Sequence, residues 1–299
     1  MKQLKIILDT DIGDDIDDAF ALAFVTDHPN INLLGVTTVF KNTKARAHQV
    51  SKYFDVINRQ DVGIYEGEGT PLKEAIKLFD KDIVLEDGLV YPPQYDDTYQ
   101  NYQYNKESAI DFIIESAYKY QGELILVPIG PLTNIALAIN KDPKIKDYIK
   151  KIVLMGGWFS ESHPEWNILC DPEAADIVFR SGIDVYAIGL DVTLQCRVEQ
   201  DTLDIINQDE TEKGKLLALW FKRWTDHFNF EKSVMHDPLA VATLISDVCV
   251  FEPKKVYVDL IETRGSIIHD DNKGTHINVA TEVDREMFFN MFKQVIYKK

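Results

Sequence analysis

Six aspartates lie within ten residues near the start of the chain, from Asp9 to Asp18. They follow the mostly apolar run Leu4–Leu8 and precede the apolar run Ala19–Phe24, so we expect a buried strand to end there and a helix to begin. Carboxylates gathered in this way repel one another, which raises their pKa values or requires a cation. Carboxylate oxygens are the ligands that Ca²⁺ and Mg²⁺ prefer. The cluster therefore predicts a divalent-cation site.

The elements that must position this cluster are apolar runs of β type, which alternate with stretches of helical spacing. The runs are Leu4–Leu8, Ile31–Val39, Leu124–Ile129, Ile152–Met155, Val185–Leu190, Val256–Ile261 and Ile277–Ala280. The alternation predicts an α/β fold with a mostly parallel central sheet flanked by helices, an open Rossmann-like core. Ligands of such sheets bind at the carboxyl ends of the strands, where the aspartate cluster lies.

We expect a single domain over residues 1–299, because no shift in composition marks a boundary. Residues 66–106 interrupt the strand and helix pattern with three prolines and five tyrosines among polar residues. A long loop of this kind inside a compact domain is usually functional. We interpret it as an excursion that covers the site.

The overall charge and composition limit the classes of partner that the protein can bind. A formal net charge of −17 argues against nucleic-acid partners, since DNA or RNA would be repelled. No window approaches the roughly 20 apolar residues of a membrane span, and the first residues do not form a leader sequence, so we expect a cytoplasmic protein. Cys170, Cys196 and Cys249 are widely spaced, which favours reduced structural thiols over a zinc site.

The pair Asp9 and Asp11 at a strand end has two functional interpretations. In a phosphatase of the haloacid dehalogenase type, Asp9 would be the nucleophile beside Mg²⁺, but that pattern wants Thr or Val where this chain has Gly13. Alternatively, the aspartates hold a catalytic cation that also binds a sugar. His236 and Asp237, next to each other before another helical stretch, support this second interpretation: the aspartate could complete the coordination and the histidine could face a leaving group.

Seven segments, in order along the chain, carry a resemblance to a known family. They are Asp9–Gly13 with Asp17–Ala19, Thr37–Val39 with Asn42, Gly130–Asn134, Leu154–Gly157, Glu165–Asn167, Asp171–Ala175, and His236 with Asp237. In these segments the chain resembles the nucleoside hydrolases of the inosine-uridine preferring type, calcium-dependent enzymes that cleave the N-glycosidic bond of ribonucleosides. The resemblance implies the same fold and the same reaction, release of free base and ribose with a Ca²⁺-bound water.

The resemblance also implies residue roles. It places the Ca²⁺ ligands at the side chains of Asp11, Asp18 and Asp237 and at the backbone carbonyl of Ile129. It makes Asp11 the base that orients and deprotonates the attacking water, and His236 the acid that serves the departing base. It assigns substrate binding to Asp17, Asn42, Met155, Glu165 and Asn167. Such a division fits a transition state with positive charge on the sugar ring and negative charge on the base.

The sequence departs from the family pattern in the aspartate loop. Two extra residues lie between Gly13 and the paired aspartates, and an ungapped match would put Ile16 at a ligand position. Isoleucine cannot coordinate an ion, so we take Asp17 and Asp18 as the pair and keep Asp15 as the rival ligand. Other departures are Ile129 where threonine is common and a short segment before Glu165, which leaves recognition of the 5′-hydroxyl open.

Several alternatives stay open from sequence. The chain could be a metal-dependent phosphatase, or a non-catalytic nucleoside or ribose binder on the same fold. Asn42 could simply cap a helix. One or two aromatic residues that precede His236 could stack on a nucleobase, although core packing is their usual role. These residues are Trp220, Trp224, Phe228 and Phe230.

From the resemblance we also expect a small-molecule ribonucleoside as the partner, a role in purine or pyrimidine salvage, and a homodimer or homotetramer.

Overall fold

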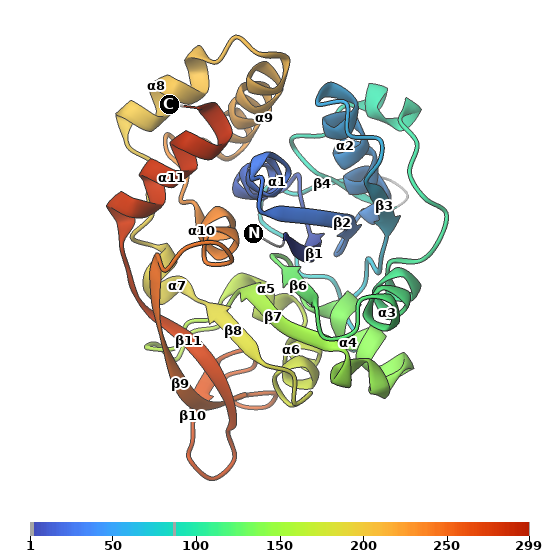
Figure 1. Ribbon diagram of the computed structural model, residues 1–299, viewed down its shortest axis with the longest axis vertical. Coiled ribbons are helices and arrows are strands. Elements are labelled where there is room, and N and C mark those ends of the chain that lie inside the picture. Colours follow the sequence, from blue (N-terminus) through green and yellow to red (C-terminus); the bar gives the residue numbers. More distant parts are fainter. Residues whose placement is uncertain (1–2, 86–87, 299) are drawn as a thin grey trace.

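Nine strands form one sheet in the computed structural model, which describes residues 3–85 and 88–298. They are β1 (Leu4–Thr10), β2 (Ile31–Thr38), β3 (Gly63–Glu66), β6 (Leu124–Pro128), β7 (Ile149–Met155), β8 (Val185–Ile188), β9 (Cys249–Val258), β10 (Ile267–His269) and β11 (Thr275–Val283). Their order is β10-β9-β11-β8-β7-β6-β1-β2-β3. Neighbours from β11 to β3 are parallel, and β9 pairs antiparallel with β10 and β11 (Figure 1). The expected mostly parallel sheet is confirmed.

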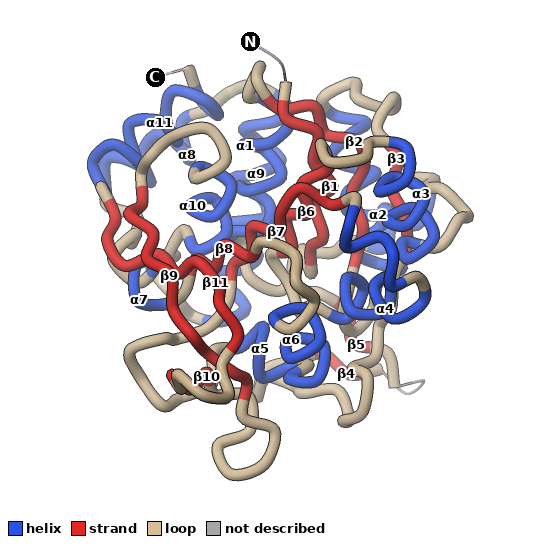
Figure 2. The backbone as a smooth tube through the Cα atoms, turned by 60° about the horizontal axis from the view of Figure 1, so that its bottom comes forward, coloured by secondary structure: helices blue, strands red, loops and turns tan. Residues whose placement is uncertain are grey.

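Helices cover both faces of this sheet (Figures 1 and 2). One face carries α1 (Asp17–Asp27), α2 (Thr43–Val56), α8 (Gln200–Gln208), α9 (Glu212–Phe228), α10 (His236–Ala242) and α11 (Arg285–Tyr297). The other carries α3 (Ala109–Lys119), α4 (Thr133–Lys141) and α6 (Pro172–Phe179). The short helices are α5 (Trp166–Cys170), α7 (Leu190–Thr193), η1 (Asp97–Asn101) and η2 (Pro143–Asp147).

The apolar residues of β1 explain its central place. Ile6 and Leu8 pack into the hydrophobic core on one face of the sheet, and Ile7 packs into the core on the other. Side chains alternate between the faces of a strand, so a strand buried on both faces needs a continuous apolar run. β1 pairs with both β2 and β6, so the aspartates that follow it lie at the end of a strand inside the sheet, two strands from the β3 edge.

The seven predicted runs all correspond to strands, with two corrections. The strand predicted to extend to Leu190 ends at Ile188, because Leu190 begins α7. The run predicted over Val256–Ile261 overlaps only the last three residues of β9, which begins at Cys249 and ends at Val258. The start of β9 escaped prediction because it pairs antiparallel and is half exposed, so charged residues interrupt its apolar ones.

The excursion at 66–106 is long, as predicted. Its regular structure comprises the small hairpin of β4 (Ile83–Val84) and β5 (Val90–Tyr91) and the helix η1. The separate expectation of a single domain over 1–299 stays a prediction, and residues 1–2, 86–87 and 299 lie outside the described part.

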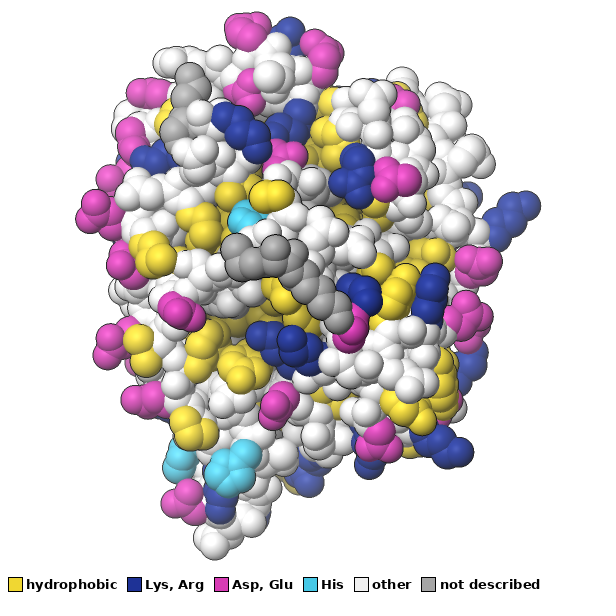
Figure 3. All heavy atoms as spheres, in the orientation of Figure 1, with side chains coloured by type: hydrophobic (Ala, Val, Ile, Leu, Met, Phe, Trp, Pro, Cys, Tyr) yellow, Lys and Arg dark blue, Asp and Glu magenta, His cyan; other side chains and the backbone are white. Residues whose placement is uncertain are grey.

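Charged side chains of both signs lie on the surface. Acidic and basic side chains are interspersed on the face that Figure 3 presents, where no continuous basic stripe appears. The three cysteines are buried and free. Within residues 3–85 and 88–298, no helix has the length and apolar character needed to cross a membrane.

Candidate active site and metal centre

A cavity of about 240 Å³ opens at the carboxyl ends of the central strands. It is lined by Asp11, Asp14, Asp15, Asp17, Asp18, Phe79, Ile129, Met155, Glu165, Trp166, Asn167, Leu190, His236 and Asp237. The predicted site residues gather here, with one exception. Asn42 lines a different cavity, and its side-chain Oδ1 caps α2 by accepting a hydrogen bond from Ala45 N at 3.0 Å.

Three buried carboxylates meet in the cavity. One oxygen each of Asp17, Asp18 and Asp237 lies within 4.8 Å of the other two, a spacing that could hold a metal ion. Helices α1 and α10 pack against each other and bring these residues together, although 220 positions separate Asp17 from Asp237. The backbone N–H of Asp237 donates to Asp17 Oδ2 at 3.1 Å. The group contains two predicted ligands and Asp17, which the resemblance assigned to the ribose.

Asp11, the predicted base, lines the same cavity and is only 7% exposed. Burial raises the pKa of Asp11 to about 7, despite the opposing charge of Arg46. Gly130 makes room for this side chain, since a Cβ at that position would lie 2.6 Å from Asp11 Oδ1. Steric exclusion of a side chain at this position therefore explains the glycine in the segment Gly130–Asn134.

The other carboxylates in the cavity repel one another. Burial raises the pKa of Asp18 well above its ordinary value, and the charges of Asp11 and Asp17 raise it further. The pKa of Asp237 is raised in the same way, by burial and then by Asp17 and Asp18. Four acidic groups this close cannot all ionise without a counter-charge. A divalent cation with oxygen ligands would remove the conflict.

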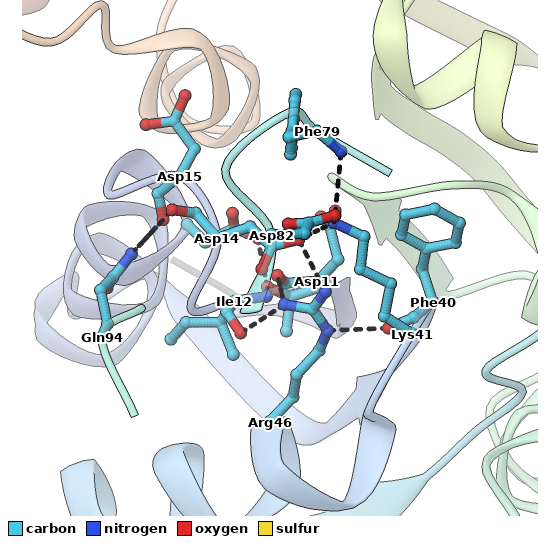
Figure 4. Close-up of polar contacts among 12 residues, drawn as sticks. Asp11, Ile12, Asp14, Asp15, Phe40, Lys41, Arg46, Phe79, Asp82 and Gln94 are labelled. Carbon is cyan, nitrogen blue, oxygen red and sulfur yellow. Dashed lines mark hydrogen bonds and ion pairs between the residues drawn. The ribbon is translucent and has the colours of Figure 1, made fainter. Parts of the chain in front are cut away.

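Asp9 and Asp14 belong to the predicted cluster, but their carboxylates already interact with other side chains of the protein. Asp9 is 1% exposed, lies outside the cavity lining and accepts hydrogen bonds from Thr37 Oγ1 at 2.5 Å and Asn134 Nδ2 at 2.7 Å. A nucleophile must reach its substrate, so this burial argues against the phosphatase alternative. Asp14 forms ion pairs with Lys41 at 2.9 Å and Arg46 at 3.0 Å (Figure 4).

Asp15, the rival ligand, is the exposed member of the cluster. Its carboxylate accepts a hydrogen bond from the backbone of Ile16 and points away from Asp11 and Arg46 (Figure 4). It lines the rim of the cavity and is not part of the group formed by Asp17, Asp18 and Asp237.

Asn167 and Glu165 also line the cavity. Asn167 Nδ2 donates to the carbonyl oxygens of Ile129 at 2.9 Å and Met155 at 3.3 Å, so this side chain holds the predicted carbonyl ligand in place. Glu165 caps α5, where Oε1 accepts from Asn167 N at 2.9 Å, and Oε2 accepts from Gly157 N at 3.0 Å. Burial raises the pKa of Glu165 above its ordinary value.

His236 faces the cavity from the start of α10. Its Nδ1 lies 2.7 Å from Thr193 Oγ1, a residue at the end of α7. Burial lowers the pKa of His236 to about 4, and the positive charge of Arg197 contributes. The imidazole is therefore neutral near pH 7. If the Thr193 hydroxyl donates to Nδ1, the proton lies on Nε2.

The aromatic wall of the cavity was missed from sequence. Phe79 and Trp166 line it, and their rings stack with centroids 4.0 Å apart at an interplanar angle of 18°. Of the aromatic residues considered as base-stacking candidates, Trp220 and Trp224 are buried in the core instead. Trp166 stands inside the recognised segment Glu165–Asn167 and could have been considered. Phe79 lies in the excursion without any motif around it.

Comparisons with known proteins agree with this geometry. The family model described as inosine-uridine preferring nucleoside hydrolase matches residues 6–290. Uridine nucleosidase 1 of Arabidopsis thaliana is 33% identical over 280 residues, covering 88% of this chain and 80% of that protein. The inosine-uridine preferring nucleoside hydrolase of Crithidia fasciculata is 32% identical over 310 residues, covering 96% and 95%. The purine-preferring ribonucleoside hydrolase from Gardnerella vaginalis superposes with a TM-score of 0.84 at 33% identity, covering 98% of each chain.

The fold and the site define an N-glycosyl hydrolase with an acidic, metal-dependent active centre. The chain belongs to the nucleoside hydrolase family, whose members hydrolyse ribonucleosides. The resemblance seen in the seven sequence segments is thus confirmed.

Proposed function

We propose that this enzyme is a Ca²⁺-dependent ribonucleoside hydrolase that releases free base and ribose. The observation that carries the proposal is the convergence of Asp17, Asp18 and Asp237 within 4.8 Å, beside Asp11 in one buried cavity. The cation would be held by Asp11, Asp18, Asp237 and the Ile129 carbonyl. Asp15 is less suited to the role, because it is exposed and turned away.

The donor atoms around the cavity fit a hard cation. All the proposed ligands are oxygens, as Ca²⁺ prefers, and no thiol or imidazole is needed. The buried cations nearest this loop, Lys41 and Arg46, are already paired with Asp14. When bound, Ca²⁺ would neutralise the clustered charge and make a coordinated water more acidic.

Asp11 is the proposed general base. Burial raises the pKa of its carboxyl to about 7 when no cation is bound, and a bound Ca²⁺ would lower that pKa and keep the carboxylate ionised and able to accept a proton at neutral pH. The carboxylate would take the proton of the attacking water. General-base help of this kind contributes roughly 10²- to 10⁴-fold to the rate.

The remaining acidic and amide groups would hold the ribose. Asp17 and Asn167 would bind the 2′- and 3′-hydroxyls, and Glu165 would take the 5′-hydroxyl beside Met155. As the glycosidic bond breaks, positive charge develops on the sugar ring, and carboxylates fixed around it stabilise that charge. Asn42 is left out of this set, because it caps α2 away from the cavity.

His236 would serve the departing base. With a pKa lowered to about 4 by burial, the neutral imidazole can donate only the proton that Nε2 carries. Thr193 would fix this tautomer by donating to Nδ1 at 2.7 Å. Negative charge grows on the base as it leaves, so a donor at this position stabilises the transition state.

The wider setting is also proposed. We infer a cytoplasmic enzyme of purine or pyrimidine salvage that forms a homodimer or homotetramer. These inferences rest on the resemblance, and light scattering coupled to size-exclusion chromatography measures the assembly directly.

A chromatographic panel of purine and pyrimidine nucleosides tests the function. We expect hydrolysis of at least one ribonucleoside, little hydrolysis of its 2′-deoxy analogue, and loss of activity in EGTA that Ca²⁺ restores. Equal turnover of the deoxy analogue would contradict the role of Asp17. Binding of a nucleoside without release of base would instead favour the non-catalytic binder.

A further inference from the structure

Lys41 is buried in an uncommon backbone conformation. Its φ is 56°, and the preceding Phe40 has a φ of 65°, so two consecutive residues with side chains adopt the left-handed region. This region is unfavourable for residues other than glycine. Such strain persists only where the surroundings over-determine the conformation, and it clusters at functional sites. The contacts of the Lys41 side chain show what holds it.

The Lys41 ammonium joins two segments that are far apart in sequence. Its Nζ lies 2.9 Å from Asp14 Oδ2 in the aspartate loop and 2.8 Å from Asp82 Oδ2 in the excursion (Figure 4). The side chains of Lys41 and of its two partners are at most 5% exposed. Removing one member of a buried ion pair leaves an uncompensated charge, so this junction is energetically important.

Asp82, the partner of Lys41 in the excursion, contacts the aromatic wall of the cavity. Asp82 Oδ2 also accepts a hydrogen bond from the backbone N–H of Phe79 at 2.9 Å. Lys41 Nζ lies 4.7 Å from the centroid of the Phe79 ring, a cation–π contact. Phe79 in turn stacks on Trp166, and both rings line the cavity.

Asp14, the partner of Lys41 in the aspartate loop, is connected to Asp11, the proposed base. Asp14 shares its Oδ2 with Arg46, whose guanidinium donates to the backbone carbonyls of Asp11 and Ile12 (Figure 4). Arg46 also donates from Nε to the carbonyl of Phe40 at 2.8 Å. The same small network therefore holds the backbone of Asp11 and the aromatic wall.

We propose that Lys41 is a positioning residue: through Asp82 it fixes Phe79 against Trp166 and sets the shape of the cavity wall that encloses the substrate. This role of Lys41 rests on the proposed function, because that proposal identifies the substrate as a ribonucleoside. Lys41 does not touch the reacting atoms in this assignment. Its loss should weaken enclosure of the substrate and raise KM, while the chemical step changes little.

Asp82→Asn is the main test, because it removes one charge and leaves Lys41 paired with Asp14. We expect KM for the best ribonucleoside to rise roughly tenfold or more, with kcat within about threefold. Lys41→Met should change KM in the same direction. Asp80→Asn, an exposed neighbour two residues away, is the matched control and should leave both constants unchanged.

A double-mutant cycle shows whether the effect passes through Phe79. If Asp82 acts by holding that ring, adding Asp82→Asn to Phe79→Leu should raise KM no further than Phe79→Leu alone. Additive effects of the two substitutions would overturn the proposal. So would a fall in kcat at unchanged KM.

A spectroscopic readout separates this proposal from the proposed function. Acrylamide quenching of the Trp166 fluorescence, obtained by subtracting the signal of the Trp166→Phe variant, should increase in Asp82→Asn and stay constant in Asp80→Asn. This measurement requires no turnover, so it remains decisive if no nucleoside is hydrolysed. Unchanged quenching in Asp82→Asn would overturn the positioning role, whatever the kinetics.

Discussion

The buried aspartates that line the cavity differ in their counter-charges: Asp14 has ion pairs, whereas Asp11, Asp17, Asp18 and Asp237, which we call the unpaired group, form none within residues 3–85 and 88–298. Asp14 is enclosed by Lys41 and Arg46. Burial alone would raise the pKa of Asp14, but these two cations outweigh it and lower the pKa below the ordinary value. Asp18 and Asp237 are as buried as Asp14, yet their pKa values are raised by burial and by neighbouring carboxylates.

This difference in counter-charge indicates which aspartates have a structural role and which are available for function. Where the chain supplies its own counter-charges, the aspartate fixes the backbone and the adjoining segments. Where no basic side chain pairs with them, the carboxylates remain available for the proposed cation and substrate. A buried carboxylate that no basic side chain pairs with is costly unless something else binds it. The unpaired group is therefore the better pointer to the active site.

The largest effect should come from the unpaired group. We expect Asp11→Asn, which preserves shape but removes the proposed base, to lower kcat by roughly 10²- to 10⁴-fold. Initial rates of base release at saturating Ca²⁺ and nucleoside measure it. The circular dichroism spectrum should match that of the parent enzyme. A loss of less than tenfold would show that another group takes the proton.

With metal removed by EGTA, neutralising Asp14 and neutralising Asp18 should have different effects on the free energy of unfolding. Asp14→Asn leaves Lys41 and Arg46 partly unpaired, so it should lower the free energy of unfolding by about 3 kcal/mol. Asp18→Asn relieves repulsion and keeps an oxygen that can accept from Thr10, so it should leave stability unchanged or raise it.

Urea unfolding of the two variants and the parent, all without metal, gives the comparison. Destabilisation of both variants by similar amounts would mean that the unpaired carboxylates also contribute to the fold. It would then remove the distinction between the two groups.

The fold was largely predictable because its central strands are buried on both faces. Their continuous apolar runs, as in Leu124–Ile129, need no knowledge of partners. The start of β9 and the short edge strand β3 were not predicted, because exposed strands alternate polar and apolar residues or are too brief to give a pattern.

The site was predictable where a motif fixes it and less so elsewhere. The aspartate loop and His236 with Asp237 pointed to one cavity, and the structure brings them together. Sequence alone does not tell Asp14 from its neighbours, since its partners Lys41 and Asp82 come from distant segments. For the same reason Phe79 was missed, because only the folded excursion carries it to the cavity.

A cation should stabilise the protein through the unpaired group. At a free Ca²⁺ concentration of 100 times Kd, binding should add about 2.7 kcal/mol to the free energy of unfolding. Asp237→Asn should reduce this gain, whereas Asp80→Asn, which changes an exposed aspartate, should keep it. Thermal melts over a Ca²⁺ titration measure the gain. Equal stabilisation of parent and Asp237→Asn would place the ion elsewhere.

The smallest effect should come from Thr193, which contacts His236 and not the unpaired group. Thr193→Val removes the hydroxyl that contacts His236 Nδ1 at 2.7 Å while keeping its shape. A single neutral hydrogen bond contributes about 0.5–1.5 kcal/mol, so kcat for a ribonucleoside should fall roughly two- to tenfold. His236→Ala should cost more with the same substrate, and an activated nitrophenyl riboside, whose leaving group needs no proton, should be nearly insensitive to both changes. If the nitrophenyl riboside slowed as much as the nucleoside, His236 would act on the sugar or on the fold, and the Thr193 contact would not help stabilise the departing base.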